Sequence, residues 1–197
     1  MSERTQIWIY RLLVLVGLCG MWLLAAGLVG RNLVPTPMAT WQAAVTLFGR
    51  RDIYEAIGET LGIYLAGMAI AAAIGLPFGL IAGGVPLVGR VLDPFFNALM
   101  ATPRVAFIPL IIVLLGLGFQ AKITIVALGA VMPILINTYA GVRNGDRELV
   151  EMAEANGASR LQVFRKILLP GASPFILVGL RLGATIGLIN SVVAELY

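Results

Sequence analysis

Long apolar stretches separated by short polar segments make up most of this chain. Five stretches reach about 18 residues or more, the length that a helix needs to cross a hydrocarbon layer of about 30 Å. Backbone polar groups find no water in lipid, so helices are expected rather than an open sheet. The pattern predicts an all-α polytopic membrane protein with five transmembrane helices, over Leu12–Gly30, Thr60–Gly83, Asn97–Leu117, Ile123–Val142 and Pro174–Leu196.

The first apolar stretch follows Arg4 and Arg11, as the h-region of a secretory signal peptide would. A signal h-region is about 7–15 residues long and ends at a small-residue cleavage site. This stretch is longer, and Leu24-Ala25-Ala26-Gly27 matches such a site poorly. We therefore expect an uncleaved first helix. Residues 1–57 are predicted to hold this helix and an outer segment, and residues 58–197 the membrane core.

Small residues recur at every fourth position in two of the predicted spans. This spacing places them on one helix face, where they let a neighbouring backbone come close, as helices associate in lipid. The two stripes predict tight, buried helix contacts rather than chemistry. They comprise Gly67, Ala71, Gly75, Gly79 and Gly83 in the second span, and Gly179, Gly183, Gly187 and Ser191 in the fifth.

Prolines interrupt the apolar stretches at Pro77, Pro103, Pro109 and Pro133. Each removes a backbone donor and tends to kink or break a helix. A kink satisfied by a neighbouring helix is the simpler interpretation of any one of them. The alternative is a broken helix that lines a solute path. Here the sequence places Arg104 directly after Pro103.

A charge-dense island of twenty residues, from Glu151 to Pro170, interrupts the apolar pattern. Before it, Asp146 follows an Asn-Gly turn signal and is placed to cap a helix over residues 147–156. Gly157 is expected to stop that helix. Ser159-Arg160-Leu161-Gln162 then matches a capping box that starts a second helix, which Pro170 would close. The island is predicted to be two surface helices joined by a glycine elbow.

Composition supports a membrane protein: 59% of residues are hydrophobic, 12% are charged, and the mean hydropathy is +0.95. The net charge of +4 is modest, so its distribution matters more, and no nucleic-acid partner is expected. A cytoplasmic N-terminus places eight basic residues inside and four outside, which the positive-inside rule favours. The inside set is Arg4, Arg11, Arg90, Arg143, Arg147, Arg160, Arg165 and Lys166; the outside set is Arg31, Arg50, Arg51 and Lys122. The island then faces the cytoplasm, and Tyr197 lies near the outer surface.

Several chemistries are excluded by residue type. The chain has no histidine and a single cysteine, Cys19, so zinc sites, internal disulfides and imidazole catalysis are not expected. Its two lysines, Lys122 and Lys166, follow alanine and arginine, so the chain contains no P-loop. We therefore expect no metal site, no cofactor and no P-loop ATP hydrolysis by this chain itself.

The island resembles the "EAA" pattern of permease subunits in bacterial ABC importers. That pattern is Glu-Ala-Ala, three residues, Gly, nine residues, Ile-x-Leu-Pro, and its spacing agrees at every step. The one departure is Met152, where the family usually has alanine. The matching positions are Glu151, Ala153, Gly157, Ile167, Leu169 and Pro170.

Over residues 58–197 the chain is also similar to the nitrate/sulfonate/taurine branch of these permeases. The matching segments are Asp93-Pro94, Ile108-Pro109-Leu110, Gly116-x-Gly118, Pro133-Ile134-x-x-Asn137-Thr138, Ala140-Gly141-Val142-Arg143 and Gly179-Leu180-Arg181. The resemblance implies a type I ABC importer permease fold in the bacterial inner membrane. It also implies transport of a small anion such as a sulfonate, taurine or nitrate.

The resemblance further implies that the loop 143–172 contains a coupling helix, which docks into a groove of a cytoplasmic ABC ATPase. Other implied partners are a second permease copy in a homodimer, a periplasmic or lipid-anchored substrate-binding protein, and membrane lipid. Any membrane protein can have an amphipathic cytoplasmic loop, which is the simpler alternative. The ATPase-coupling residues would be Glu151, Met152, Ala153, Gly157, Ala158, Ser159, Ile167, Leu169 and Pro170.

Ionisable groups inside a span are costly and therefore candidates for function. Arg181 and Arg104 could attract an anionic solute, and the alternative is that each reaches the membrane surface or pairs there. With Pro103 and Asn137, they are the candidate residues of the translocation path. Which solute would pass is not determined by the sequence.

Two further function classes compete with an ABC permease. An ion-coupled secondary transporter would use broken helices as gates and would usually show paired inverted repeats and a mid-membrane acid. The five predicted spans lack such an acid, since Glu195 lies near the outer end of the fifth. A structural scaffold would tolerate loss of the helix that ends at Gly157. Permeases of the resembled branch usually have a sixth helix, which we expect to be missing because this sequence is a fragment or a truncated form.

Overall fold

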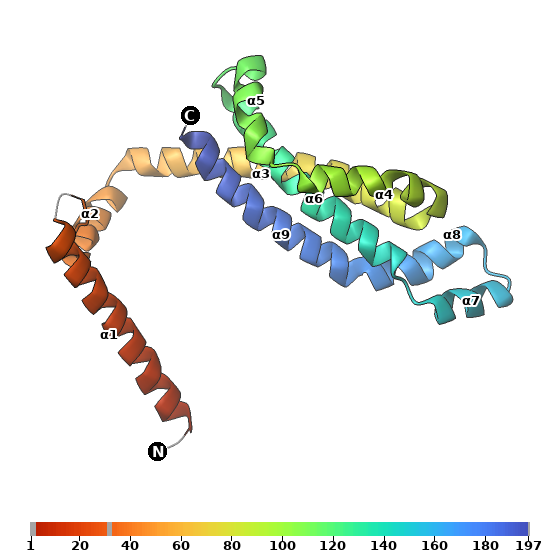
Figure 1. Cartoon of the computed structure of the whole chain (residues 1–197), viewed down its shortest axis with the longest axis horizontal. Coiled ribbons are helices and arrows are strands. Elements are labelled where there is room, and N and C mark those ends of the chain that lie inside the picture. Colours follow the sequence, from red (N-terminus) through yellow and green to blue (C-terminus); the bar gives the residue numbers. More distant parts are fainter. Residues whose placement is uncertain (1–2, 31–32, 197) are drawn as a thin grey trace. The chain divides into compact units, whose positions relative to one another are not determined.

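The computed structural model describes residues 3–30 and 33–196, so Arg31 and Tyr197 of the sequence analysis lie outside the described residues. The described part is built from helices and contains no strand (Figure 1). Four of its helices are long and apolar enough to cross a membrane, and a bent helix pair provides a fifth candidate span. An all-α polytopic fold is confirmed. Contacts divide the chain into two compact units, residues 1–57 and 58–197.

The first unit contains α1 (Glu3–Val29) and α2 (Pro37–Phe48). Helix α1 begins at Glu3 rather than at the predicted Leu12, because a helix can continue past its apolar stretch into polar surface turns. Thr36 caps α2, and its hydroxyl accepts a hydrogen bond from the Ala39 amide at 3.3 Å. The indole of Trp22 donates to the carbonyl of Pro35 at 2.9 Å, which fastens the start of α2 to α1.

The second unit has α6 (Phe119–Arg143) as its core helix. Three apolar clusters surround it, and each contains α6 residues together with residues from other helices. The neighbours that supply these contacts are α3 (Arg51–Gly84), α4 (Pro86–Ala101), α5 (Ile108–Leu115) and α9 (Leu169–Glu195). The remaining helices are a 3₁₀ turn (Arg104–Phe107), α7 (Arg147–Ala155), α8 (Arg160–Val163) and a π-helical turn (Phe164–Leu168).

Both small-residue stripes pack against α6, as predicted. A Cβ atom added to Gly79 of α3 would lie 2.6 Å from the carbonyl oxygen of Leu135. A Cβ atom added to Gly183 of α9 would lie 2.8 Å from the Ile134 side chain. Such distances leave no room for any larger residue, so glycine permits the close approach of the three helices.

The third predicted span, Asn97–Leu117, is a bent pair of helices, broken at Pro103 rather than only kinked there. Helix α4 ends at Ala101, and Thr102 has an extended backbone with φ −77° and ψ 126°. A proline disfavours helical geometry in the residue before it, and Pro103 therefore ends the helix here. The two arms on either side of the break make an angle of 81°. By contrast, Pro77 and Pro133 stay inside continuous helices, as the kink interpretation predicted.

The prediction that Pro170 closes the second island helix is wrong. The helical path continues from Arg160 to Glu195, with Pro170 in the first turn of α9. A π-helical turn comes directly before it, and there the Leu169 amide donates to the carbonyl of Phe164. This wider turn accommodates a residue that lacks a backbone donor. The island therefore joins the last span without a break.

Candidate coupling surface and solute path

Helix α7 begins at a defined cap. The Asp146 carboxylate accepts hydrogen bonds from the amides of Glu148 and Leu149, at 3.0 and 3.3 Å. A carboxylate at this position also interacts favourably with the positive end of the helix dipole. The predicted cap is confirmed, and the helix ends at Ala155, one residue before its predicted end.

Gly157 forms the predicted elbow. Its φ of +81° lies in the left-handed region, which glycine adopts without steric cost. The Gly157 amide donates to the carbonyl of Glu154 at 2.9 Å, and the Ala158 amide donates to that of Ala153 at 3.0 Å. This pair of bonds is a Schellman motif, which satisfies two carbonyls at the end of α7.

The second island helix starts two residues later at a capping box. The Ser159 amide donates to the Gln162 side chain at 2.8 Å, and the Gln162 amide donates to the Ser159 hydroxyl at 3.4 Å. The motif predicted from sequence is therefore present. With both helix ends satisfied by local bonds, the elbow has a defined geometry rather than that of a free loop.

The candidate coupling residues gather around this elbow. Five of them line one hollow of about 440 Å³ in the angle between α7 and α8. Ser159 caps α8, and Leu169 and Pro170 open α9. Glu151 is exposed and lies instead on a neighbouring cavity. The five residues in the hollow are Met152, Ala153, Gly157, Ala158 and Ile167.

The elbow carries exposed apolar residues. The side chains of Leu149, Met152 and Leu161 are 45%, 58% and 63% exposed. Among the described residues no ion pair involves Glu151, so its carboxylate is available to an external donor. Helices α7 and α8 lie together at the end of the second unit where α6 ends and α9 begins (Figure 1). Such a surface suits a helix-in-groove contact.

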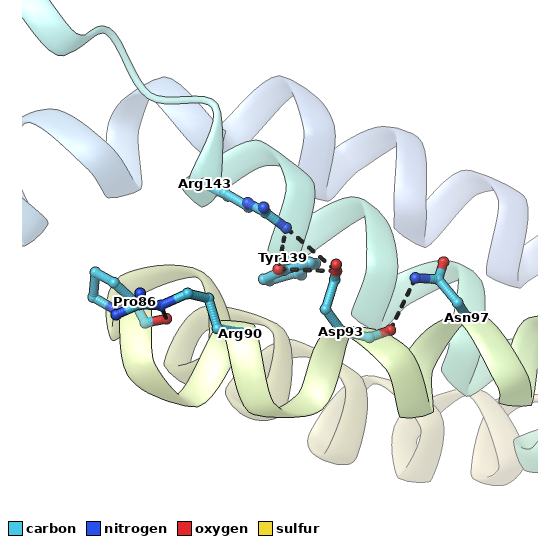
Figure 2. A network of polar contacts seen from close by, with 6 residues as sticks. All are labelled: Pro86, Arg90, Asp93, Asn97, Tyr139 and Arg143. Carbon is cyan, nitrogen blue, oxygen red and sulfur yellow. Dashed lines mark hydrogen bonds and ion pairs between the residues drawn. The ribbon is translucent and has the colours of Figure 1, made fainter.

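A polar network that the sequence analysis did not predict lies beneath α7. The Asp93 carboxylate of α4 accepts from the Tyr139 hydroxyl at 3.1 Å and from the Arg143 guanidinium at 3.3 Å (Figure 2). Arg143 also donates to the Tyr139 hydroxyl. Arg143 and Glu151 both line a cavity of about 570 Å³ between α4, α6 and α7. The network therefore links the middle of α4 to the C-terminal end of α6, which leads into α7.

Asp93 lies outside the predicted third span. That span began at Asn97, whereas α4 extends back to Pro86 and contains Asp93. Sequence reasoning missed the network because Asp93 and Arg143 are fifty positions apart. A signal did exist, since both residues belong to the family-like segments Asp93-Pro94 and Ala140-Gly141-Val142-Arg143.

Arg104 lies directly after the break in the third span. Its guanidinium donates to the carbonyl oxygen of Gly129 at 3.0 Å. In an α-helix that carbonyl would bond the amide four residues on, but residue 133 is proline and has no N–H. The half-buried Arg104 therefore supplies the donor that Pro133 lacks.

Arg104 and Pro103 line a cavity of about 330 Å³ between the break, α6 and α9. Asn190 of α9 borders the same cavity, and its side-chain amide donates to the carbonyl of Ile125 at 3.3 Å. Gly129 makes room for this amide, because an added Cβ atom would lie 1.8 Å from Asn190 Nδ2. Asn190 was not among the predicted site residues.

The other two candidate path residues lie elsewhere. Asn137 sits between α6 and α9, and its side-chain amide donates to the carbonyl of Pro133 at 2.8 Å. Arg181 is exposed on α9, two positions after the buried Gly179 and therefore on the opposite helix face. The structure thus brings Pro103 and Arg104 together and places neither Asn137 nor Arg181 on their cavity.

These features define a class: a multi-pass helical permease subunit with a structured loop between two of its spans. The chain belongs to the family of binding-protein-dependent transport system inner membrane components, whose family model matches residues 75–197. It is therefore the membrane subunit of an ABC transporter, and this finding does not fit an ion-coupled secondary transporter.

Curated relatives agree with this assignment. The chain is 36% identical over 182 residues to the aliphatic sulfonates transport permease protein SsuC of Escherichia coli, covering 91% of this chain and 69% of the relative. It is 32% identical over 168 residues to the taurine transport system permease protein TauC of the same species, covering 83% and 61%. The bicarbonate transport system permease protein CmpB of a Synechocystis species is 32% identical over 137 residues, covering 70% and 49%.

Proposed function

We propose that this subunit forms the path through which an ABC importer moves a small anion across the bacterial inner membrane. ATP hydrolysis takes place on a separate cytoplasmic ATPase subunit, since the sequence contains no P-loop. The membrane core is residues 58–197, and the loop 143–172 receives the motion of the ATPase. Relatives named for aliphatic sulfonates, taurine and bicarbonate support a small anionic or zwitterionic solute.

The observation that carries this proposal is the capped elbow at Gly157. A helix pair that transmits motion must stay rigid, and both ends of this elbow are fixed by local hydrogen bonds. Its exposed apolar side chains, Leu149, Met152 and Leu161, offer a surface for the ATPase groove. Glu151 supplies an anchor for a donor on that subunit.

Motion of the elbow has a physical route to the broken span. Helix α7 follows Arg143, whose guanidinium lies 3.3 Å from the carboxylate of Asp93 in the middle of α4. The C-terminal end of α4 is the break beside Arg104. We therefore infer that displacement of α7 is transmitted through the Asp93–Arg143 pair to the residues around the cavity at Arg104.

The remaining partners and the orientation follow from the same assignment. A second copy of this chain completes the bundle as a homodimer, surrounded by membrane lipid, and a periplasmic or lipid-anchored binding protein delivers the solute. The N-terminus is cytoplasmic, because that orientation leaves eight basic residues inside and four outside. Pro103, Arg104, Asn137 and Arg181 are the path residues we propose.

Co-purification with the ATPase subunit tests the coupling role. Glu151→Gln and Gly157→Ala should each retain less ATPase in detergent while membrane insertion stays normal. Glu148→Gln is the matched control, because Glu148 is an exposed acid in the first turn of the same helix. Wild-type retention of the ATPase in both test variants would contradict the proposal.

Thiol labelling tests the orientation. In a Cys19→Ser background, Leu161→Cys should react with a membrane-impermeant maleimide only after the cells are opened. Gln120→Cys, at the opposite end of the second unit, should react in intact cells. Labelling of the cysteine at position 161 from outside would place α8 beyond the reach of any cytoplasmic ATPase.

A further inference from the structure

The cavity beside the break of the third span has the composition of a binding site for an amphiphilic anion. Its volume is about 330 Å³, and residues from the break, α6 and α9 form its walls. No aspartate or glutamate is among the lining residues, whereas Arg104 contributes a positive charge. A cavity with an unbalanced guanidinium favours an anion over a cation or a neutral solute.

One hydrogen bond orients the guanidinium of Arg104 and leaves its other N–H donors available. One N–H group of Nη1 donates to the Gly129 carbonyl, and this bond fixes the position of the side chain. A guanidinium has five N–H donors in a planar fork, a geometry that suits oxyanions with several oxygens. The Gly129 bond therefore positions the group without exhausting its donors.

The rest of the lining is apolar apart from the Asn190 amide and the Thr102 hydroxyl, which donates to the carbonyl of Ala98 at 2.8 Å. The NH₂ group of Asn190 donates to the carbonyl of Ile125, and its carboxamide oxygen accepts no hydrogen bond from the described residues. The branched aliphatic lining residues are Val105, Ile108, Ile111, Ile125, Leu128 and Ile186. A short aliphatic chain fits against them, and an amine on that chain would find the Asn190 oxygen.

We propose that this cavity is a solute-recognition subsite for short aliphatic sulfonates, with Arg104 binding the sulfonate group and Asn190 facing the far end of the solute. The inference rests on the proposed function, because it assigns a substrate class and two specificity residues to the path of the importer. Such a subsite gives the permease its own selectivity for the anion, in addition to the selectivity of the binding protein.

The test must separate recognition from the structural role of Arg104 toward Gly129. Pro133→Ala provides this separation, because alanine restores the N–H that the Gly129 carbonyl lacks. The variants Arg104→Ala, Pro133→Ala and the double variant would be reconstituted with the ATPase subunit and binding protein. Uptake of ethanesulfonate, ATP hydrolysis and melting temperature are then measured for each.

We expect the uptake of ethanesulfonate by the Arg104→Ala variant to fall about tenfold or more, because a hydrogen bond to a charged group is lost. In the double variant the melting temperature should recover while uptake stays low. Uptake that recovers together with the melting temperature would overturn the subsite, since Arg104 would then serve only Gly129.

A second pair of variants tests the subsite if the alanine variants fold poorly. Arg104→Lys retains the charge, whereas Arg104→Gln retains a donor for Gly129 without the charge. Uptake by the lysine variant should clearly exceed that by the glutamine variant, and equal uptake by the two would overturn the subsite. Absence of ethanesulfonate uptake by a wild-type complex that still takes up bicarbonate would overturn the sulfonate assignment, whereas absence of ATP-dependent uptake of both solutes would contradict the proposed function itself.

Discussion

Arg104 donates to the carbonyl oxygen of Gly129 at 3.0 Å, at the position where Pro133 leaves α6 without its own donor. Two sequence features that look separate, a proline inside one span and an arginine after the break of another, are thus one structural unit. The arginine stabilises the core helix at its proline and, through the same bond, is held at the wall of the cavity.

This relationship predicts a non-additive effect on stability. Arg104→Ala should leave the buried Gly129 carbonyl unsatisfied and destabilise the protein by about 1–3 kcal/mol. In a Pro133→Ala background the same change should cost much less, because the new amide bonds the carbonyl. Thermal unfolding in detergent of the two single variants and the double variant measures the coupling. Additive effects of the two changes would contradict the assignment.

The glycine stripe of α3 predicts a second stability effect. Gly79→Ala places a Cβ atom 2.6 Å from the Leu135 carbonyl oxygen, which is backbone and cannot rotate away. Overpacking of this kind costs about 1–3 kcal/mol. Gly62→Ala on the same helix is the control, because nothing lies within 4 Å of its added Cβ. Similar melting temperatures for the two variants would argue against α3–α6 contact at Gly79.

The elbow predicts opposite effects of one substitution at two glycines. Neither Gly157 nor Gly171 has an atom within 4 Å of an added Cβ, so space does not distinguish them. Gly157 has a φ of +81°, and alanine there should cost about 1 kcal/mol. Gly171 lies in α9, where alanine should be neutral or slightly stabilising. The melting temperatures of the two variants, and the amount of ATPase subunit that co-purifies with each, measure the difference.

The helix caps, the elbow and the buried helix faces could be predicted from sequence, because each depends on residues close together in the chain. Asp146 and Ser159 cap their helices through bonds to residues two or three positions away, and Gly157 turns the chain by its own backbone freedom. The spacing of small residues likewise predicted which faces of α3 and α9 are buried, because helical periodicity is a local property.

What the sequence could not provide were relationships between distant segments. Nothing in local spacing pairs Asp93 with Arg143, or Arg104 with a carbonyl of α6. A proline alone does not show whether a helix continues, because this depends on whether another donor reaches the carbonyl left unpaired. Pro133 stays inside a helix because Arg104 supplies that donor, whereas Pro103 ends a helix. Pro170 was misjudged because a wide helical turn before it accommodates the missing donor.

The Asp93–Arg143 pair predicts loss of coupling with little loss of stability. Its side chains are 40% and 54% exposed, so the pair should contribute about 0.2–1 kcal/mol to folding. Asp93→Asn should therefore melt near the wild-type temperature, yet transport less solute per ATP hydrolysed. Asp52→Asn, which breaks the exposed Arg50–Asp52 pair, is the control. A normal ratio of transport to hydrolysis in Asp93→Asn would exclude the proposed route.

The central claim, that the elbow between α7 and α8 contacts the ATPase, is tested most directly by site-specific cross-linking. In a Cys19→Ser background, Met152→Cys carries one exposed thiol on α7 for a short bifunctional reagent applied to the assembled complex. Contact at the elbow predicts a permease–ATPase adduct from position 152 and none from a Gln120→Cys control. An adduct from position 120, with none from position 152, would contradict it.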